Sequence, residues 1–191
     1  MKKWHAAVLM VLAGTLTAAP AHAQIGAPVY ATSSTVSVRF AGASAGGVSD
    51  LYWFLTPGSA TRQFLLTNGG SAVGDVVTIN HTFNVGDEVV FGFDDFRSGS
   101  FFYSGPSSRN ADGFAHMAVN PLVDPTFTIR AGWEDLFGGG DQDYDDLLFD
   151  FGGVSATQPP PTTTTPEPAT LALLVPGVMA LAFVRRRRRV S

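Results

Sequence analysis

Hydrophobic and polar residues alternate in short segments along the middle of this chain. The first segment holds Val36, Val38 and Phe40, each separated from the next by one residue. Similar or wholly apolar segments follow at 51–55, 64–66, 77–83, 89–93, 114–118, 127–131 and 147–151. A period of two with breaks about every ten residues is typical of antiparallel sandwiches and barrels. Because several segments carry apolar residues on both faces, we predict an all-β fold, an antiparallel, jelly-roll-like β-sandwich.

The amino end has the organisation of a secretory signal peptide. Lys2 and Lys3 precede an apolar segment at 6–16, and Ala21-His22-Ala23 places small residues where a signal peptidase cuts. We therefore expect a signal peptide over 1–23 and a mature chain that begins at Gln24. The folded domain is expected over 24–156, and a Pro/Thr-rich linker, which cannot form a core, over 157–165.

The carboxyl end combines three features in a fixed order over 166–191. Pro166-Glu167-Pro168 is followed by an apolar run at 169–184 and then by five arginines at 185–189. Apolar runs of this kind prefer hydrocarbon to water, and a terminal arginine cluster resists crossing a membrane. We expect a transmembrane helix over about 168–184.

This arrangement resembles the PEP-CTERM sorting signal, whose parts are a Pro-Glu-Pro motif, a hydrophobic helix and a terminal basic cluster. The resemblance implies export in a Gram-negative bacterium, a precursor anchored in the inner membrane, and recognition by a sorting enzyme of the exosortase type. It also implies delivery to the cell surface or the extracellular matrix, where exopolysaccharide is an expected partner.

The charge of the exported part excludes one class of partner. Residues 24–165 contain five arginines, no lysine and 15 acidic residues, which gives a formal charge of 5 − 15 = −10. A domain this acidic is a poor partner for nucleic acid and is suited to binding cations. Since the chain has no cysteine, no disulfide can stabilise the fold, so the core or a metal must do so.

An acidic segment at 133–147 is the strongest chemical signal in the domain. Six carboxylates fall within 134–146, with no basic residue among them, and Gly138-Gly139-Gly140 permits a tight loop. Carboxylates brought together without a counter-charge repel one another, whereas Ca²⁺ takes 6–8 oxygen ligands at variable angles. The segment is neither an EF-hand nor a calcium-binding nonapeptide repeat. We predict a Ca²⁺ site with Asp141, Asp143 and Asp146 as first-choice ligands and Glu134, Asp135 and Asp145 as the next.

The same segment resembles the exported domain known as the domain of unknown function numbered 4114. The matching residues are Trp133, Glu134, Asp135, Gly140, Asp141, Asp143, Tyr144, Asp146 and Leu147. The segment 85–93 also resembles that family's middle strand, so the resemblance covers roughly 75–151. It implies a β-rich, calcium-binding module and supplies no catalytic mechanism.

These observations favour an exported, non-enzymatic module that Ca²⁺ stabilises and that has a structural or adhesive role. The alternative is a calcium-dependent, lectin-like carbohydrate-binding module in which aromatic residues or calcium contact the sugar. The aromatic candidates are Tyr52, Trp53, Phe101, Phe102 and Tyr103. A small secreted glycoside hydrolase is least favoured, because carboxylates crowded on one loop suit an ion better than an acid/base pair.

Overall fold

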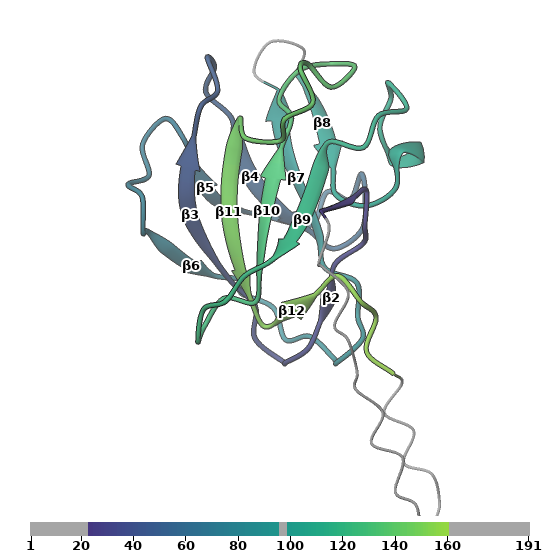
Figure 1. The fold of residues 1–191 in the computed structure, drawn as a ribbon. Coiled ribbons are helices and arrows are strands. Elements are labelled where there is room, and N and C mark those ends of the chain that lie inside the picture. The colour runs from purple at the N-terminus through teal and green to yellow at the C-terminus, as the bar shows by residue number, and fades with distance from the viewer. Residues whose placement is uncertain (1–22, 96–98, 161–191) are drawn as a thin grey trace, which may run out of the picture.

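Two antiparallel β-sheets packed face to face form the body of the protein (Figure 1). The computed structural model describes residues 23–95 and 99–160. The larger sheet has the strand order β1-β9-β10-β11-β3-β6, the smaller has the order β5-β4-β7-β8, and β12 pairs with β2. The strands are β1 Gln24–Ile25, β2 Tyr30–Ala31, β3 Ser37–Ala43, β4 Asp50–Phe54, β5 Arg62–Thr67, β6 Val76–Thr78, β7 Val90–Asp95, β8 Ser100–Tyr103, β9 Met117–Pro121, β10 Ile129–Trp133, β11 Leu147–Gly152 and β12 Val154–Ser155. The one helix in the described ranges is a single 3₁₀ turn, Ser107–Arg109.

The core lies between the two sheets and consists mainly of aromatic side chains. Phe91 of β7 stacks on Phe151 of β11 with ring centroids 4.2 Å apart. Phe93 of β7 meets Trp133 of β10 edge to face at 5.3 Å. All four rings are buried, and burying one large apolar side chain contributes about 1.5–3 kcal/mol. These contacts join β10 and β11, the two central strands of the larger sheet, to β7, an inner strand of the smaller sheet.

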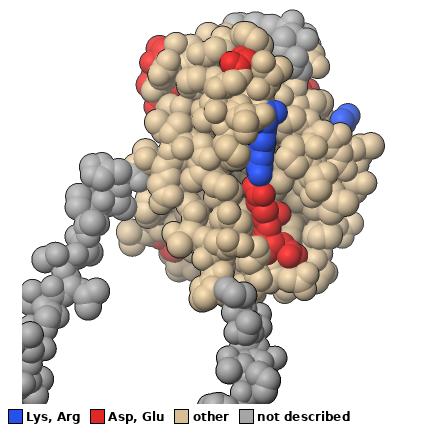
Figure 2. All heavy atoms as spheres, turned by 90° about the vertical axis from the view of Figure 1, so that its right-hand side faces the viewer, with Lys and Arg blue, Asp and Glu red and all other residues tan. Residues whose placement is uncertain are grey.

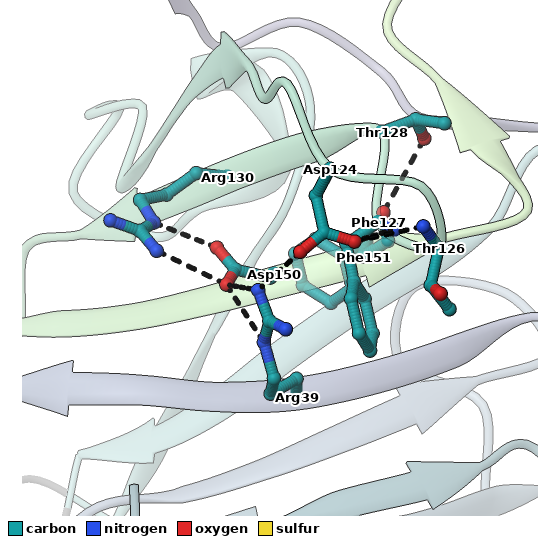
Figure 3. A network of polar contacts seen from close by, with 8 residues as sticks. All are labelled: Arg39, Asp124, Thr126, Phe127, Thr128, Arg130, Asp150 and Phe151. Carbon is teal, nitrogen blue, oxygen red and sulfur yellow. Dashed lines mark hydrogen bonds and ion pairs between the residues drawn. The ribbon is translucent and has the colours of Figure 1, made fainter. Parts of the chain in front are cut away.

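The outer face of the larger sheet carries an ion-pair network centred on Asp150 of β11 (Figure 3). Arg39 of β3 and Arg130 of β10 each donate to its carboxylate, with shortest distances of 2.7 Å. Asp124 also accepts from Arg39 at 3.2 Å, and the Arg39 guanidinium lies 4.1 Å from the centre of the Phe127 ring. Burial opposes ionisation of Asp150, but the hydrogen bonds from Arg130 and Arg39 outweigh it and lower the pKa of Asp150. The network therefore connects three neighbouring strands.

The alternating pattern predicted most of the strands, and the all-β, antiparallel architecture is confirmed. The segment at 77–83 differs, because its strand ends at Thr78. His81 instead stacks on Trp53 with ring centroids 4.9 Å apart. Likewise β9 begins at Met117, so Phe114 and His116 precede it. A turn at 68–70 follows β5, and another at Asn84 is closed by the Asp87 amide, which donates to the Asn84 carbonyl at 3.0 Å.

The two expected targeting segments fall almost entirely on residues that the structure does not describe. Residues 1–22 of the expected signal peptide and the expected membrane helix at 168–184 lie outside the described residues, as does the Pro166–Pro168 motif. Within the ranges 23–95 and 99–160, no helix is long and apolar enough to cross a membrane.

Candidate metal centre

The acidic segment forms the connection between the paired strands β10 and β11. Trp133 and Leu147 are the last partners in the register of these strands, so residues 134–146 leave and re-enter the sheet at adjacent points. The loop lies at the upper end of the domain in Figure 1. Figure 2, which views the right-hand side of Figure 1, shows acidic atoms at the same end, and below them basic and then acidic atoms down the middle of this face.

Close contacts fasten this loop to the sheet. The backbone of Tyr144 passes over Gly132 so closely that a Cβ at Gly132 would lie 1.9 Å from the Tyr144 carbonyl oxygen. The Tyr144 hydroxyl donates to the Ala115 carbonyl at 2.9 Å. Gly139 packs against the Phe114 ring, where a Cβ would overlap the ring carbons at 2.2 Å. Glycine is therefore required at Gly132 and Gly139 for the loop to fold back onto the domain.

Five residues of the loop adopt the left-handed backbone conformation. They are Gly138, Gly139, Gly140, Gln142 and Tyr144, with φ between 48° and 82°. For a residue other than glycine such a conformation is uncommon and costs of order 1–3 kcal/mol. The two non-glycine residues flank Asp143, so the strained backbone sets the direction of that carboxylate. The surrounding contacts must offset this cost.

The structure brings Glu134, Asp141 and Asp143 together. One carboxylate oxygen from each lies within 4.8 Å of the other two. Glu134 directly follows β10 and is fully buried, whereas Asp141 and Asp143 are exposed. The Oε1 atom of Glu134 accepts from the Tyr144 amide at 2.6 Å. Its Oε2 atom is buried with no hydrogen-bond partner among the described residues, and Gly140 lies directly against it.

The electrostatics of this group disfavour three ionised carboxylates without a nearby positive charge. Burial raises the pKa of Glu134 and the charges of Asp146 and Asp141 raise it further, and together they outweigh the backbone hydrogen bonds from Tyr144 and Gln142, which lower it. Partial removal from water, together with the charges of Asp141 and Asp145, raises the pKa of Asp143. Both shifts indicate that the negative forms lack sufficient compensation. A cation placed between the three residues would supply it.

The remaining predicted ligands have other roles in the structure. Asp146 accepts the Asp135 amide on its Oδ2 atom at 3.0 Å, and its carbonyl accepts the Ser44 and Ala45 amides at 3.0 Å each. Asp145 accepts the Ser44 hydroxyl at 2.5 Å. Asp135 is buried. Asp135, Asp145 and Asp146 are therefore outside the group that Glu134, Asp141 and Asp143 form.

A buried histidine–aspartate pair contacts the loop, and no motif in the sequence indicates this pair. The two ring nitrogens of His116 lie 2.8 Å from the Glu134 carbonyl oxygen and 2.8 Å from Asp112 Oδ2. Which ring nitrogen donates depends on the tautomer of His116. Asp112 also accepts the Gly138 amide at 2.8 Å. Burial opposes ionisation of Asp112, but these donors outweigh it and lower the pKa of Asp112. The pair fixes both the start and the middle of the loop.

No protein-family model matches this chain, and no match was found among curated proteins or solved structures. The geometry of the loop and of the sheets therefore carries the functional argument by itself.

Proposed function

We propose that this protein is an exported, non-enzymatic structural or adhesive module whose acidic loop binds Ca²⁺. The observation that carries the proposal is Glu134, whose buried Oε2 atom lacks a hydrogen-bond partner among the described residues and whose carboxylate belongs to a group with Asp141 and Asp143. A buried charged oxygen without a partner is costly, at about 1–3 kcal/mol or more. A bound cation would convert that cost into a stabilising interaction.

The donor set favours a hard cation. All three groups offer carboxylate oxygens, which suit Ca²⁺ and Mg²⁺ rather than zinc. Ca²⁺ accepts irregular arrangements of ligands, while Mg²⁺ demands near-ideal octahedral geometry. Because strained backbone and packing against Phe114 dictate the direction of these side chains, the more adaptable ion fits better. Glu134, Asp141 and Asp143 would hold it, and carbonyl or water oxygens would complete its shell.

The spacing of the carboxylates also bears on catalysis. The three oxygens lie within 4.8 Å of one another. Glycoside hydrolysis uses two carboxyl groups about 5–9.5 Å apart, on opposite sides of the bond that breaks. Convergence on one point favours ion binding over acid/base chemistry. In this proposal the ion locks the connection between two core strands.

We propose that this module functions outside the cytoplasm, and the sequence signals at the two ends support this proposal. In the proposal the amino-terminal signal peptide exports the chain, the helix at 168–184 anchors the precursor in the inner membrane, and an exosortase-type enzyme recognises Pro166-Glu167-Pro168. The domain, of jelly-roll-like type, then functions at the cell surface or in the extracellular matrix, in contact with exopolysaccharide.

Thermal unfolding with and without calcium tests the metal site. We expect a higher melting temperature for the full chain in excess Ca²⁺ than in chelator, at a fixed detergent concentration and equal ionic strength. Free ion at 100 times the dissociation constant adds about 2.7 kcal/mol. At about 2–4 °C per kcal/mol this corresponds to roughly 5–11 °C. An unchanged melting temperature would falsify the calcium assignment.

Two neighbouring aspartates provide a matched pair of variants. Asp143→Asn and Asp145→Asn each remove one negative charge from the same exposed loop, but only Asp143 belongs to the group with Glu134. We expect Asp143→Asn to abolish most of the calcium-dependent shift and Asp145→Asn to retain it. If both variants lose the shift equally, calcium acts by general neutralisation of charge rather than at this site.

A further inference from the structure

The outer face of the smaller sheet carries a continuous aromatic surface. Alternation along β4 directs Trp53 into the core and Tyr52 and Phe54 outward. On the neighbouring strand β5, Phe64 pairs with Tyr52 in the register. The aromatic surface is completed by two rings from β8, and its members are Tyr52, Phe54, Phe64, Phe101 and Tyr103.

The rings form one connected surface across all four strands. Tyr52 lies 5.7 Å from both Phe64 and Phe101, measured between ring centroids. Phe54 lies 5.2 Å from Phe101 and 5.1 Å from Tyr103. They meet above Gly92 of β7, where a Cβ would lie 2.9 Å from the Phe54 ring. Three gaps between strands of about 4.8 Å give a width of roughly 14 Å. Phe54 is the buried floor, and Phe64 is 48% exposed.

Among the described residues, one cation, Arg62, lies on this aromatic surface, and it has no carboxylate partner there. The Arg62 guanidinium lies 5.1 Å from the Phe101 ring centroid and 5.5 Å from that of Tyr52. The other described arginines are all ion-paired, namely Arg39, Arg109 and Arg130. Within the described ranges, Arg62 alone keeps its donors available. An exposed donor over aromatic rings is an arrangement suited to a ligand that has both apolar faces and hydroxyl groups.

Hydrogen-bond acceptors lie at the opposite end of the surface. The Tyr52 hydroxyl donates to Asp50 Oδ2 at 3.4 Å, and Asp94 Oδ1 accepts the Asp50 amide at 2.8 Å. Burial raises the pKa of Tyr52, and the charges of Asp50 and Asp94 raise it further. The phenol therefore stays protonated at neutral pH. The aromatic surface thus has a donor at one end and carboxylate acceptors at the other.

We propose that the outer aromatic face of the β5-β4-β7-β8 sheet binds an uncharged polysaccharide. Pyranose rings present C–H faces that pack on aromatic rings, while their hydroxyls both donate and accept hydrogen bonds. The charge of the exported part, −10 by the count 5 − 15 over residues 24–165, repels an acidic polymer and a second copy of this chain. An uncharged partner meets neither penalty. This site is on the opposite sheet from the acidic loop, so it needs no metal and does not depend on the proposed calcium site.

Binding to insoluble neutral polysaccharides tests this assignment. The full chain, in a detergent without a sugar headgroup, is mixed with cellulose, chitin or curdlan particles, and depletion from solution gives a binding isotherm. Polygalacturonate particles provide the acidic comparison. We expect binding to at least one neutral polymer, none to polygalacturonate, and the same affinity in calcium and in chelator. Binding to none of the neutral polymers, or to the acidic one alone, would overturn the proposal.

Variants distinguish binding at the aromatic surface from nonspecific adsorption of the protein. Phe64→Ala and Arg62→Ala truncate exposed side chains of the surface, and we expect about a tenfold or greater loss of affinity from Phe64→Ala. Phe137→Ala is the matched control, because Phe137 is also an exposed phenylalanine, at 65%, but lies on the acidic loop. Equal losses in Phe64→Ala and Phe137→Ala contradict the site. A dimer in light scattering that Phe64→Ala abolishes would instead assign this face to self-association.

Discussion

Replacing Glu134 by glutamine separates the cost of its buried charge from its structural contacts. Glutamine has the same shape, and its carbonyl oxygen can keep the hydrogen bond from the Tyr144 amide that Oε1 now accepts at 2.6 Å. The amide nitrogen then takes the position of Oε2, which has no partner among the described residues. An unpaired charged acceptor is thereby replaced by an uncharged donor, while the other two carboxylates of the group, Asp141 and Asp143, are kept.

The expected effect has opposite signs with and without calcium. In chelator, Glu134→Gln removes a buried, unsatisfied charged oxygen, whose cost is about 1–3 kcal/mol. At about 2–4 °C per kcal/mol the melting temperature should rise by roughly 2–12 °C. In excess Ca²⁺ the wild-type protein gains the binding energy and the variant does not. The calcium-dependent shift should therefore disappear while the unfolding temperature of the metal-free protein increases.

The pH dependence of this gain follows from the direction of the pKa shift. Because the folded pKa of Glu134 is raised, its ionisation destabilises the fold once the pH exceeds the unfolded value of about 4.3. The advantage of Glu134→Gln in chelator should vanish below about pH 4 and increase as the pH rises from there toward the raised folded pKa. Circular-dichroism melts at pH 4 and pH 7, with and without calcium, measure all four conditions. A variant that melts below the wild type in chelator at pH 7 would refute the reasoning, since the carboxylate would then be stabilising by itself.

Two further predictions concern contacts outside the metal group. Asp150→Asn should destabilise the fold by about 2–3 kcal/mol in urea unfolding at pH 7, below the 3–5 kcal/mol of a fully buried pair, because Arg39 and Arg130 are partly exposed. Since the folded pKa of Asp150 is lowered, its stabilisation is present above about pH 4 and is lost as the pH falls through the folded value, so this variant should show a flatter acid limb. Gly132→Ala should cost about 1–3 kcal/mol or more and weaken the calcium shift, because the new Cβ would meet the Tyr144 carbonyl at 1.9 Å. The control Gly70→Ala places its Cβ in ordinary contact, 3.7 Å from Thr67, and a similar loss in both would contradict the packing argument.

The sequence predicted the sheets well because the alternating pattern reports directly which side chains enter the core. Val38 and Phe40 in β3, or Phe149 and Phe151 in β11, are buried as their spacing indicates. The pattern failed at His81, where a ring that continues the alternation stacks on Trp53 of another strand instead. Long-range ring stacking of this kind leaves no local signal.

The alternation of side chains along each strand also shows which aromatic candidates face outward and which enter the core, a distinction that composition does not make. Neighbouring residues of a strand point to opposite faces, so a pair such as Tyr52-Trp53 cannot lie on one surface. Trp53 and Phe102 are buried in the core, and Tyr52, Phe101 and Tyr103 face outward. The sequence identified the right segments but not the assembly of their rings into one surface, which depends on the pairing of four strands.

The composition of the acidic segment indicated a cation site, but which acids converge could not be read from spacing. The directions of these carboxylates depend on left-handed backbone at Gln142 and Tyr144. Glutamine and tyrosine rarely adopt this conformation, so the sequence does not predict it there. They depend equally on Asp112 and His116, which lie outside the acidic segment and fix the loop through Gly138 and Glu134. The spacing of the acids along the sequence therefore cannot show that Glu134, rather than Asp146, belongs to the carboxylate group.

The two ends of the sandwich, which we call its poles, differ: one carries the acidic loop and the other does not. β10 delivers the chain to the acidic loop at one pole, and β11 returns it to the other, where β12 and the exit of the described chain lie (Figure 1). A tether that begins after residue 160 would hold the protein by the pole without the loop. The carboxylates of the acidic loop would then face away from the tether, toward the surrounding medium. The calcium concentration of that medium, rather than that of the cell interior, would determine how rigid the loop becomes.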